Sequence, residues 1–135
     1  MESVRTADTF AERLLGSQLH RMGLRYRKNV RTVFGRPDIV FPTPRVAVFV
    51  DGDYWHGRIL QQSGLEALNA SLKTSNREFW VRKIQQNVAR DALVSGELTR
   101  AGWTIVRVWE TDVKRNPDVV AKRVFDAVKL RKEST

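Results

Sequence analysis

Carboxylates and one histidine are concentrated in residues 35–56, whose sequence is GRPDIVFPTPRVAVFVDGDYWH. Asp38 opens one apolar run, and Asp51, Asp53 and His56 close the next. If the two runs pair as antiparallel strands, these side chains gather near one end of a sheet. Hard divalent cations take oxygen ligands from a few convergent carboxylates plus waters. The stretch therefore predicts a cation site, although aspartate and glycine are also the residues that ordinary turns contain.

Two further acids lie on the apolar sides of predicted helices. Glu12 follows the same helical spacing as Leu15 and Leu19, and Asp91 lies seven residues after Ile84. Residues at such spacings share one face of a helix, so both carboxylates are predicted to point inward. An unpaired carboxylate on the core side is costly. Glu12 therefore lies at the edge of the apolar stripe, pairs with an arginine, or serves a functional site, and Asp91 is predicted to face inward in the same way.

The acidic residues stand out against the charge of the whole chain. Lysine and arginine number 24, aspartate and glutamate number 15, and the formal net charge is +9 at pH 7. Such a charge predicts a polyanionic partner, most often nucleic acid. A basic rim could hold a phosphodiester while the acidic centre holds Mg²⁺, and a histidine, with an ordinary pKa near ~6.5, can move a proton at neutral pH. The combination predicts metal-assisted phosphodiester hydrolysis.

Composition limits the remaining possibilities. The 135 residues, 41% of them hydrophobic, are enough for one domain that spans residues 1–135. The chain contains no cysteine, which excludes disulfides and cysteine-ligated zinc. No signal peptide is recognisable, and no apolar run approaches the ~18 residues of a membrane span. We therefore expect a cytoplasmic protein without membrane contact.

Hydrophobic periodicity predicts the elements that must position these groups. The predicted elements are a helix over residues 8–23, strands over 39–41 and 46–50, a helix from residue 76 that continues or restarts to a stop at Gly102, a buried strand over 103–109 and a helix after Pro117. Residues 57–75 are expected to form a loop with one short helix around 65–72. This order is typical of a mixed α/β fold.

Basic residues form two groups that could contact a nucleic-acid backbone. A predicted half-exposed strand and loop carries the first group, and the solvent side of the long helix carries the second. The predicted DNA-binding residues are Arg25, Arg27, Lys28 and Arg31 in the first group and Arg82, Lys83 and Arg90 in the second. Phosphate contact is the functional interpretation, and a solvated basic face is the alternative.

Five separated segments resemble one nuclease family. The segments are AERLL (11–15), GRPDIVF (35–41), FVDGDYWHG (49–57), REFWVRKIQQNVARD (77–91) and GWTIVRVWE (102–110). They are similar, in order, to the very-short-patch-repair endonucleases and to related phage and homing-type nucleases. The resemblance implies a restriction-endonuclease-like fold, in which helices flank a central mixed β-sheet, and it implies a metal-dependent DNA endonuclease.

The resemblance also implies individual roles. Asp38 would bind Mg²⁺, for which Mn²⁺ can substitute, with the backbone carbonyl of Val50, and we assign Asp51 as a second ligand. His56 would transfer a proton, while Glu12 and Asp91 would position waters at the scissile phosphate. Tyr54 and Trp55 match an aromatic pair that deforms DNA in the family, with core packing as the alternative for Trp55.

Departures from the family pattern indicate which members of the family the chain resembles most. Asp51 stands where mismatch-repair members have a second histidine, and Asp53 stands where they have a zinc-binding cysteine. No structural zinc is therefore expected, and the chain is closer to the zinc-less homing and phage-type relatives. Either His56 or a lysine such as Lys83 could act as the general base, and we favour His56. The alternatives are a T:G mismatch-specific nickase and a non-catalytic DNA-binding module, and a targeting domain or protein partner could direct either kind of protein.

Overall fold

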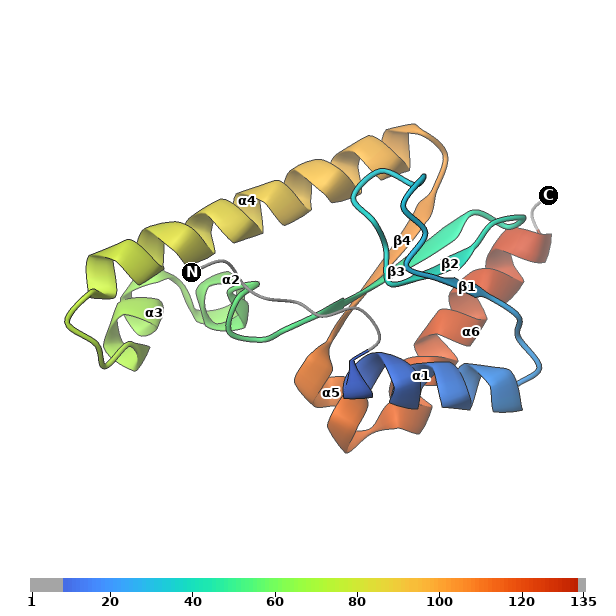
Figure 1. Ribbon diagram of the computed structural model, residues 1–135, viewed down its shortest axis with the longest axis horizontal. Helices are drawn as coiled ribbons and strands as arrows, with labels where there is room; N and C mark the ends of the chain where they lie inside the picture. The colour runs from blue at the N-terminus through green and yellow to red at the C-terminus, as the bar shows by residue number, and fades with distance from the viewer. Residues whose placement is uncertain (1–8, 134–135) are drawn as a thin grey trace.

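A mixed β-sheet lies at the centre of the molecule, with helices on both faces (Figure 1). The computed structural model describes residues 9–133. Within this range the sheet contains β1 (Arg27–Lys28), β2 (Ile39–Phe41), β3 (Val46–Asp51) and β4 (Thr104–Trp109), in that spatial order. The β1–β2 and β2–β3 pairs are antiparallel, and β3–β4 is parallel. The predicted α/β fold with a central mixed sheet is confirmed.

The pairing of β2 with β3 brings the predicted acids to one end of the sheet. Ile39 lies opposite Val48, and the backbone N–H of Asp38 donates to the carbonyl of Val48 at 3.0 Å. The chain therefore enters β2 beside the end of β3, where Asp51 lies. Parallel pairing then places Trp109 of β4 opposite Asp51.

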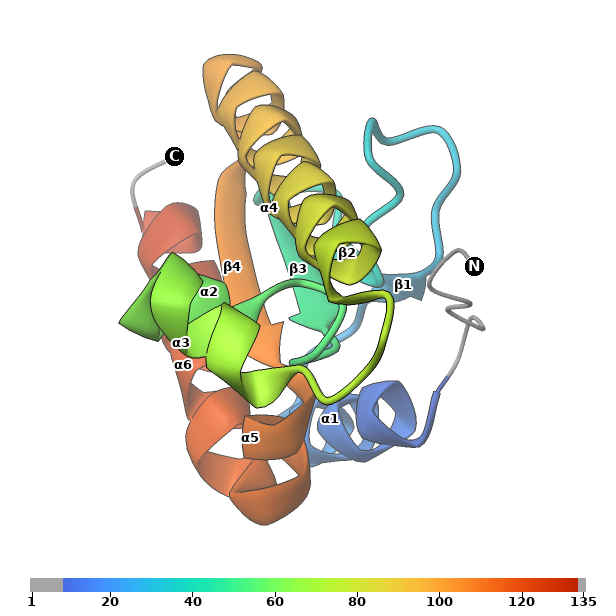
Figure 2. The ribbon, with the colours of Figure 1, turned by 90° about the vertical axis from the view of Figure 1, so that its left-hand side faces the viewer.

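Alternate residues of β3 pack against opposite helical layers, as the two-residue period of a strand requires. Val48 and Val50 belong to the core under α1 (Phe10–Arg21), α5 (Glu110–Arg115) and α6 (Pro117–Glu133). Ala47 and Phe49 instead contact Val94 of α4 (Arg77–Arg100), which crosses the other face (Figure 2). Because every residue of β3 is buried, its sequence is continuously apolar up to Asp51.

Residues 57–75 differ from the predicted loop with one short helix. They contain two helices, α2 (Arg58–Ser63) and α3 (Leu65–Ser71), and α3 packs on the first half of α4 around Leu68, Leu72 and Ile84. Each helix has fewer than two full turns, which is too short for a recognisable period. None of the described helices has the length and apolarity needed to cross a membrane.

Candidate active site

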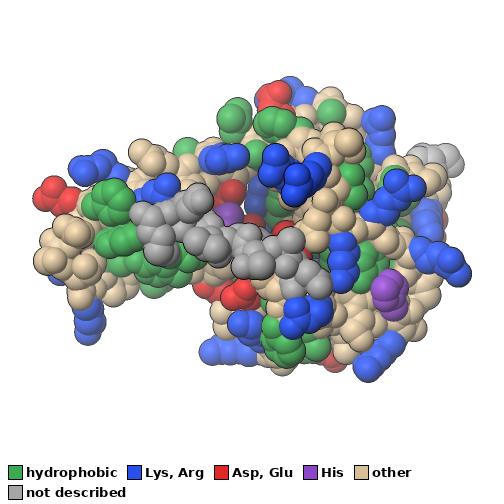
Figure 3. All heavy atoms as spheres, in the orientation of Figure 1, with side chains coloured by type: hydrophobic (Ala, Val, Ile, Leu, Met, Phe, Trp, Pro, Cys, Tyr) green, Lys and Arg blue, Asp and Glu red, His purple; other side chains and the backbone are tan. Residues whose placement is uncertain are grey.

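The end of β3 opens into a cavity of about 450 Å³. The lining residues are Asn29, Arg31, Gly35, Arg36, Asp38, Phe49, Asp51, His56, Asn87, Arg90, Asp91, Val94 and Arg107. They come from the β1–β2 connection, the sheet, the segment after β3 and α4. In Figure 3, acidic and histidine side chains are visible in a hollow with lysine and arginine side chains around it. The cavity therefore combines an acidic centre with a cationic surround.

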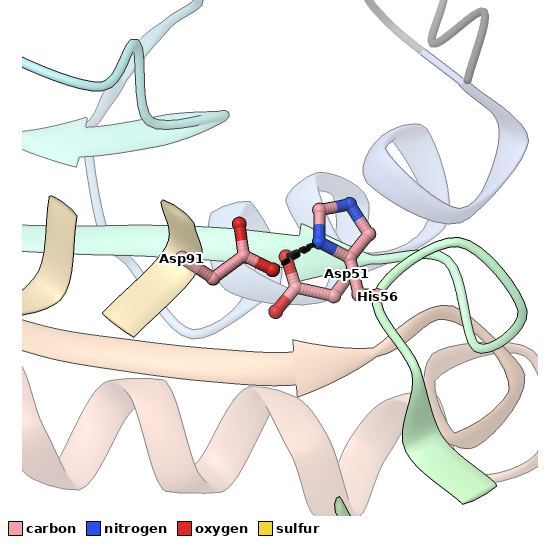
Figure 4. Close-up of side chains that lie close together, drawn as sticks. All are labelled: Asp51, His56 and Asp91. Carbon is pink, nitrogen blue, oxygen red and sulfur yellow. Dashed lines mark hydrogen bonds and ion pairs between the residues drawn. The ribbon is translucent and has the colours of Figure 1, made fainter. Parts of the chain in front are cut away.

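Asp51, His56 and Asp91 meet in this cavity, with ligand atoms that all lie within 4.8 Å of one another (Figure 4). Nδ1 of His56 forms a hydrogen bond with the Asp91 carboxylate and lies 3.7 Å from Oδ1 of Asp51. A charged carboxylate only accepts, so Nδ1 carries the proton of the neutral ring and Nε2 is its basic nitrogen. His56 can therefore accept or release a proton through Nε2.

The backbone around His56 is held close to α4. Its N–H donates to the carbonyl of Gly52 at 3.0 Å, and its carbonyl accepts from Nε2 of Gln61 at 2.7 Å. The next residue, Gly57, has φ 66°, and a Cβ there would lie 2.8 Å from a methyl group of Ile84. Only glycine combines this left-handed conformation with such close approach. The turn into α2 thus fixes where the imidazole sits.

Arg107 connects the Asp51 end of the sheet to α4. Its Nη1 donates to both carboxylate oxygens of Asp51 at 3.0 and 3.1 Å, and its Nη2 donates to the backbone carbonyl of Asp91 at 3.2 Å. Nε donates to the hydroxyl of Ser95 at 2.8 Å, and the guanidinium lies 4.1 Å from the ring centroid of Phe49. Sequence reasoning missed this residue because it lies inside an apolar strand. A single charge within TIVRVW was the signal that could have identified it.

Burial raises the pKa of Asp51 above its ordinary value, although Arg107 and His56 favour the charged form and partly offset the effect. Asp91 adds to the rise by repulsion between like charges. A carboxylate in this position favours the approach of an additional cation, because the cation would stabilise the charge that burial penalises. The electrostatics of the site therefore suit a divalent metal.

Asp38 and Glu12 have different surroundings. Asp38 lines the cavity, and its Oδ2 accepts the backbone N–H of Val50 at 2.7 Å. Glu12 is 1% exposed, as its inward spacing predicted, and its carboxylate accepts from the hydroxyl of Thr9 at 3.2 Å. Among the described residues that line the cavity, Glu12 is absent. Its role at a reacting phosphate remains a prediction, as does that of the Val50 carbonyl.

Known proteins match most of the chain. It is 42% identical over 129 residues to the type II nicking enzyme V.NmeDIP of Neisseria meningitidis serogroup C, covering 96% of this chain and 83% of that protein. It is 38% identical over 126 residues to the type II nicking enzyme V.HpaIIP of Haemophilus parainfluenzae, covering 93% and 85%. The family model described as DNA mismatch endonuclease Vsr matches residues 1–62. The chain belongs to the Vsr family of DNA endonucleases.

The mismatch endonuclease Vsr of Escherichia coli (strain K12) is itself 33% identical over 110 residues, covering 82% of this chain and 66% of that protein. Membership of the Vsr family confirms the resemblance that the five segments predicted, and it makes DNA the substrate. The segments that carried the resemblance supply Asp38, Asp51, His56 and Asp91 to one cavity.

The predicted DNA-binding residues occupy several parts of this Vsr-family fold. Arg31 and Arg90 line the cavity, and the others lie outside it. Arg25, Arg27, Lys28 and Arg82 are exposed, Lys83 is half-buried, Tyr54 is exposed and Trp55 is half-buried. The Trp55 ring lies 5.5 Å from that of Trp80, so one side of it contacts the protein while the residue stays partly exposed. Contact with DNA remains a prediction for each of these residues.

Asp53 does not join the acidic centre, which corrects the grouping predicted from the sequence. Its Oδ1 accepts from the backbone N–H and hydroxyl of Thr111 at 3.0 and 2.7 Å, and its Oδ2 accepts from Arg58 at 2.8 Å. Asp53 therefore links the segment before His56 to the first turn of α5. Burial alone would raise its pKa, but the bonds from Arg58 and Thr111 lower the pKa below the ordinary value.

We expect Asp53→Ala to lower the free energy of unfolding at pH 7 by about 1–2 kcal/mol, through loss of hydrogen bonds to a charged group. A lowered pKa means that folding favours the ionised carboxylate. This stability is present above 3.8, the ordinary value, and is lost as the pH falls through the folded pKa. Urea unfolding at pH 7 and pH 3 measures the effect, with Asp126→Ala on the exposed face of α6 as the control. A difference from the parent that stays constant with pH would contradict the prediction.

Proposed function

We propose that this Vsr-family protein is a Mg²⁺-dependent endonuclease that nicks one strand of duplex DNA. The observation that supports the proposal is the contact of His56 with Asp91, beside Asp51, in the cavity that Asp38 also lines. The relatives named as nicking enzymes support a single-strand cut. A purely binding protein has no reason to place acids where phosphate would lie, at the centre of a basic surface.

The donor set fits a hard divalent cation. Carboxylates of Asp38 and Asp51 would hold the ion, with the carbonyl of Val50 as the further predicted ligand, and oxygen ligands are what Mg²⁺ and Mn²⁺ prefer. A bound ion would supply Lewis-acid stabilisation of charge on the phosphate and a more acidic water. The pairing of Asp51 with Arg107 keeps its carboxylate oriented toward the cavity.

Protein groups would perform the remaining steps. Nε2 of His56 would accept a proton from the attacking water or return one to the leaving oxygen, while Asp91 fixes the tautomer from the other side of the ring. Arg31 and Arg90, which line the cavity, would hold phosphates on either side of the scissile bond. Affinity for DNA should therefore fall steeply as the salt concentration rises.

Cleavage of supercoiled plasmid with Mg²⁺, with Mn²⁺ or with EDTA tests the proposal. We expect open circles with either metal and unchanged plasmid with EDTA. Linear plasmid as the first product would contradict single-strand cutting, and cutting in EDTA would contradict metal dependence. DNA binding without cleavage under every condition would support the non-catalytic alternative. Nicks at one defined site would mean that the chain needs no targeting domain or protein partner.

A T:G mismatch-specific nickase is the second candidate, and the match to the mismatch endonuclease model over residues 1–62 favours it. Nicking rates on T:G-mismatched and fully paired duplexes of the same sequence, at equal salt, separate the two candidates. We expect little preference, because Asp51 stands where the repair members of the family have a histidine. A large preference for the mismatched duplex would support the second candidate.

A further inference from the structure

The connection between β1 and β2 forms a fixed turn beside the catalytic cavity. The backbone N–H of Asn29 donates to the carbonyl of Asp38 at 3.1 Å, and that of Arg36 donates to the carbonyl of Val33 at 3.0 Å. Arg36 has φ 52°, in the left-handed region that arginine rarely occupies, and Asn29, a residue type found there more often, has φ 50°. Such backbone strain persists only where surrounding structure enforces it, and it gathers at functional sites.

Packing against α4 enforces this conformation. Gly35 has φ 80°, and a Cβ there would lie 2.3 Å from a methyl group of Val94. Val94 follows Asp91 by three residues on the same helix. The turn therefore holds a fixed position relative to the carboxylate that orients His56, and Gly35 is the residue that allows such close approach.

The turn presents an aromatic side chain to solvent. Val33 packs against the core formed by Ala47 and Phe49, whereas the neighbouring Phe34 is 54% exposed. A single exposed apolar residue is common on protein surfaces. Phe34 differs because a strained and anchored turn holds it outward, next to Gly35 and Arg36 in the cavity lining.

We propose that Phe34 is a DNA-reading residue, which stacks on a base or enters a base step close to the nick while Arg31 and Arg36 hold the adjacent phosphates. Aromatic side chains stack on bases, and inserted apolar side chains bend a duplex by unstacking a step. Both arginines line the catalytic cavity, so phosphates bound by them would bring the bases beside Phe34. This inference rests on the proposed function, because it requires DNA to enter that cavity.

Cross-linking from position 34 tests the placement directly. The chain has no cysteine, so Phe34→Cys introduces a unique thiol for an aryl azide photo-cross-linker. The matched control is Leu130→Cys on α6, where the native side chain is 68% exposed. Both variants also carry Asp38→Asn, so that the DNA is not cut. The DNA is a duplex that carries the nicking site, or a supercoiled plasmid if no site is known. We expect cross-links from position 34 to bases within a few nucleotides of the nick and none from position 130. Equal cross-linking from both positions, or links spread evenly along the duplex, would overturn the proposal.

Nicking rates give a second readout. We expect Phe34→Ala to lower kcat/KM on duplex DNA by on the order of 10-fold and to broaden the distribution of nick positions, with Phe34→Trp close to the parent. Val119→Ala, at an exposed apolar position on α6, should leave kcat/KM and the distribution of nick positions unchanged. Unchanged rate and nick positions in Phe34→Ala would overturn the reading role. If the parent itself fails to nick, the proposed function fails, while cross-linking still reports independently whether DNA lies against Phe34.

Discussion

Asp38→Asn is expected to abolish nicking of supercoiled plasmid, with a loss of about 10³-fold or more, while duplex binding is retained or becomes tighter. Loss of the carboxylate removes the principal predicted ligand of Mg²⁺, and metal stabilisation of a phosphoryl transition state is worth several kcal/mol. Asparagine keeps an oxygen that can accept the N–H of Val50, which Asp38 accepts at 2.7 Å. The substitution therefore removes the charge with little disturbance of the sheet.

Plasmid nicking and a gel-shift titration with the same duplex separate the two effects of this substitution. Asp118→Asn, at an exposed aspartate in the first turn of α6, is the matched control and should behave as the parent. Binding is expected to tighten because removal of a negative charge lowers repulsion of phosphate. Cleavage by Asp38→Asn at the parent's rate would exclude Asp38 as a metal ligand.

The position of the site could be predicted from the sequence because local patterns determine it. The short Pro-Thr-Pro turn makes β2 and β3 adjacent and antiparallel, so Asp38 and Asp51 must lie at the same end of the sheet. The helical spacing of Asp91 predicted its inward direction, and it lines the cavity. In each case the period of a single element decides where the side chain points.

These patterns could not predict contacts between elements that are far apart in the sequence. Asp53 follows β3 by two residues, yet Thr111, 58 residues later, turns its carboxylate away from the cavity. Arg107 looked like part of an apolar strand, and only the placement of α4 over the sheet shows that it binds Asp51 and Ser95. Side-chain direction beyond the end of a strand depends on such tertiary partners, which leave no period in the sequence.

Arg107 also explains how the buried carboxylate of Asp51 is kept in one orientation. Burial raises the pKa of Asp51, and an isolated carboxylate there would tend to bind a proton. Two hydrogen bonds from Nη1 of Arg107 hold both oxygens of Asp51, and the same guanidinium reaches the backbone of Asp91. One side chain thus sets the distance between the two acids that contact His56.

His56→Ala is expected to lower the nicking rate by about 10²- to 10⁴-fold, the range typical of a positioned proton-transfer group. Nδ1 of His56 is bonded to Asp91, so the ring presents Nε2 as its basic nitrogen, and alanine supplies no replacement. Single-turnover nicking measured across pH 5–9 tests the role. The part of the parent's pH dependence that comes from the imidazole should disappear, and added imidazole should restore some activity to the variant.

The chain contains one other histidine, which provides a matched control. His20 stacks on Tyr26 with ring centroids 4.7 Å apart, and it lies outside the described lining of the cavity that holds His56, so His20→Ala should keep the parent's rate and pH profile. Asp91→Asn should resemble His56→Ala in rate, because an amide can donate to Nδ1 and so stabilise the wrong tautomer. A His56→Ala variant that folds and keeps the parent's pH–rate profile would make His56 a packing residue, and the proton would then have to pass through another group such as Lys83.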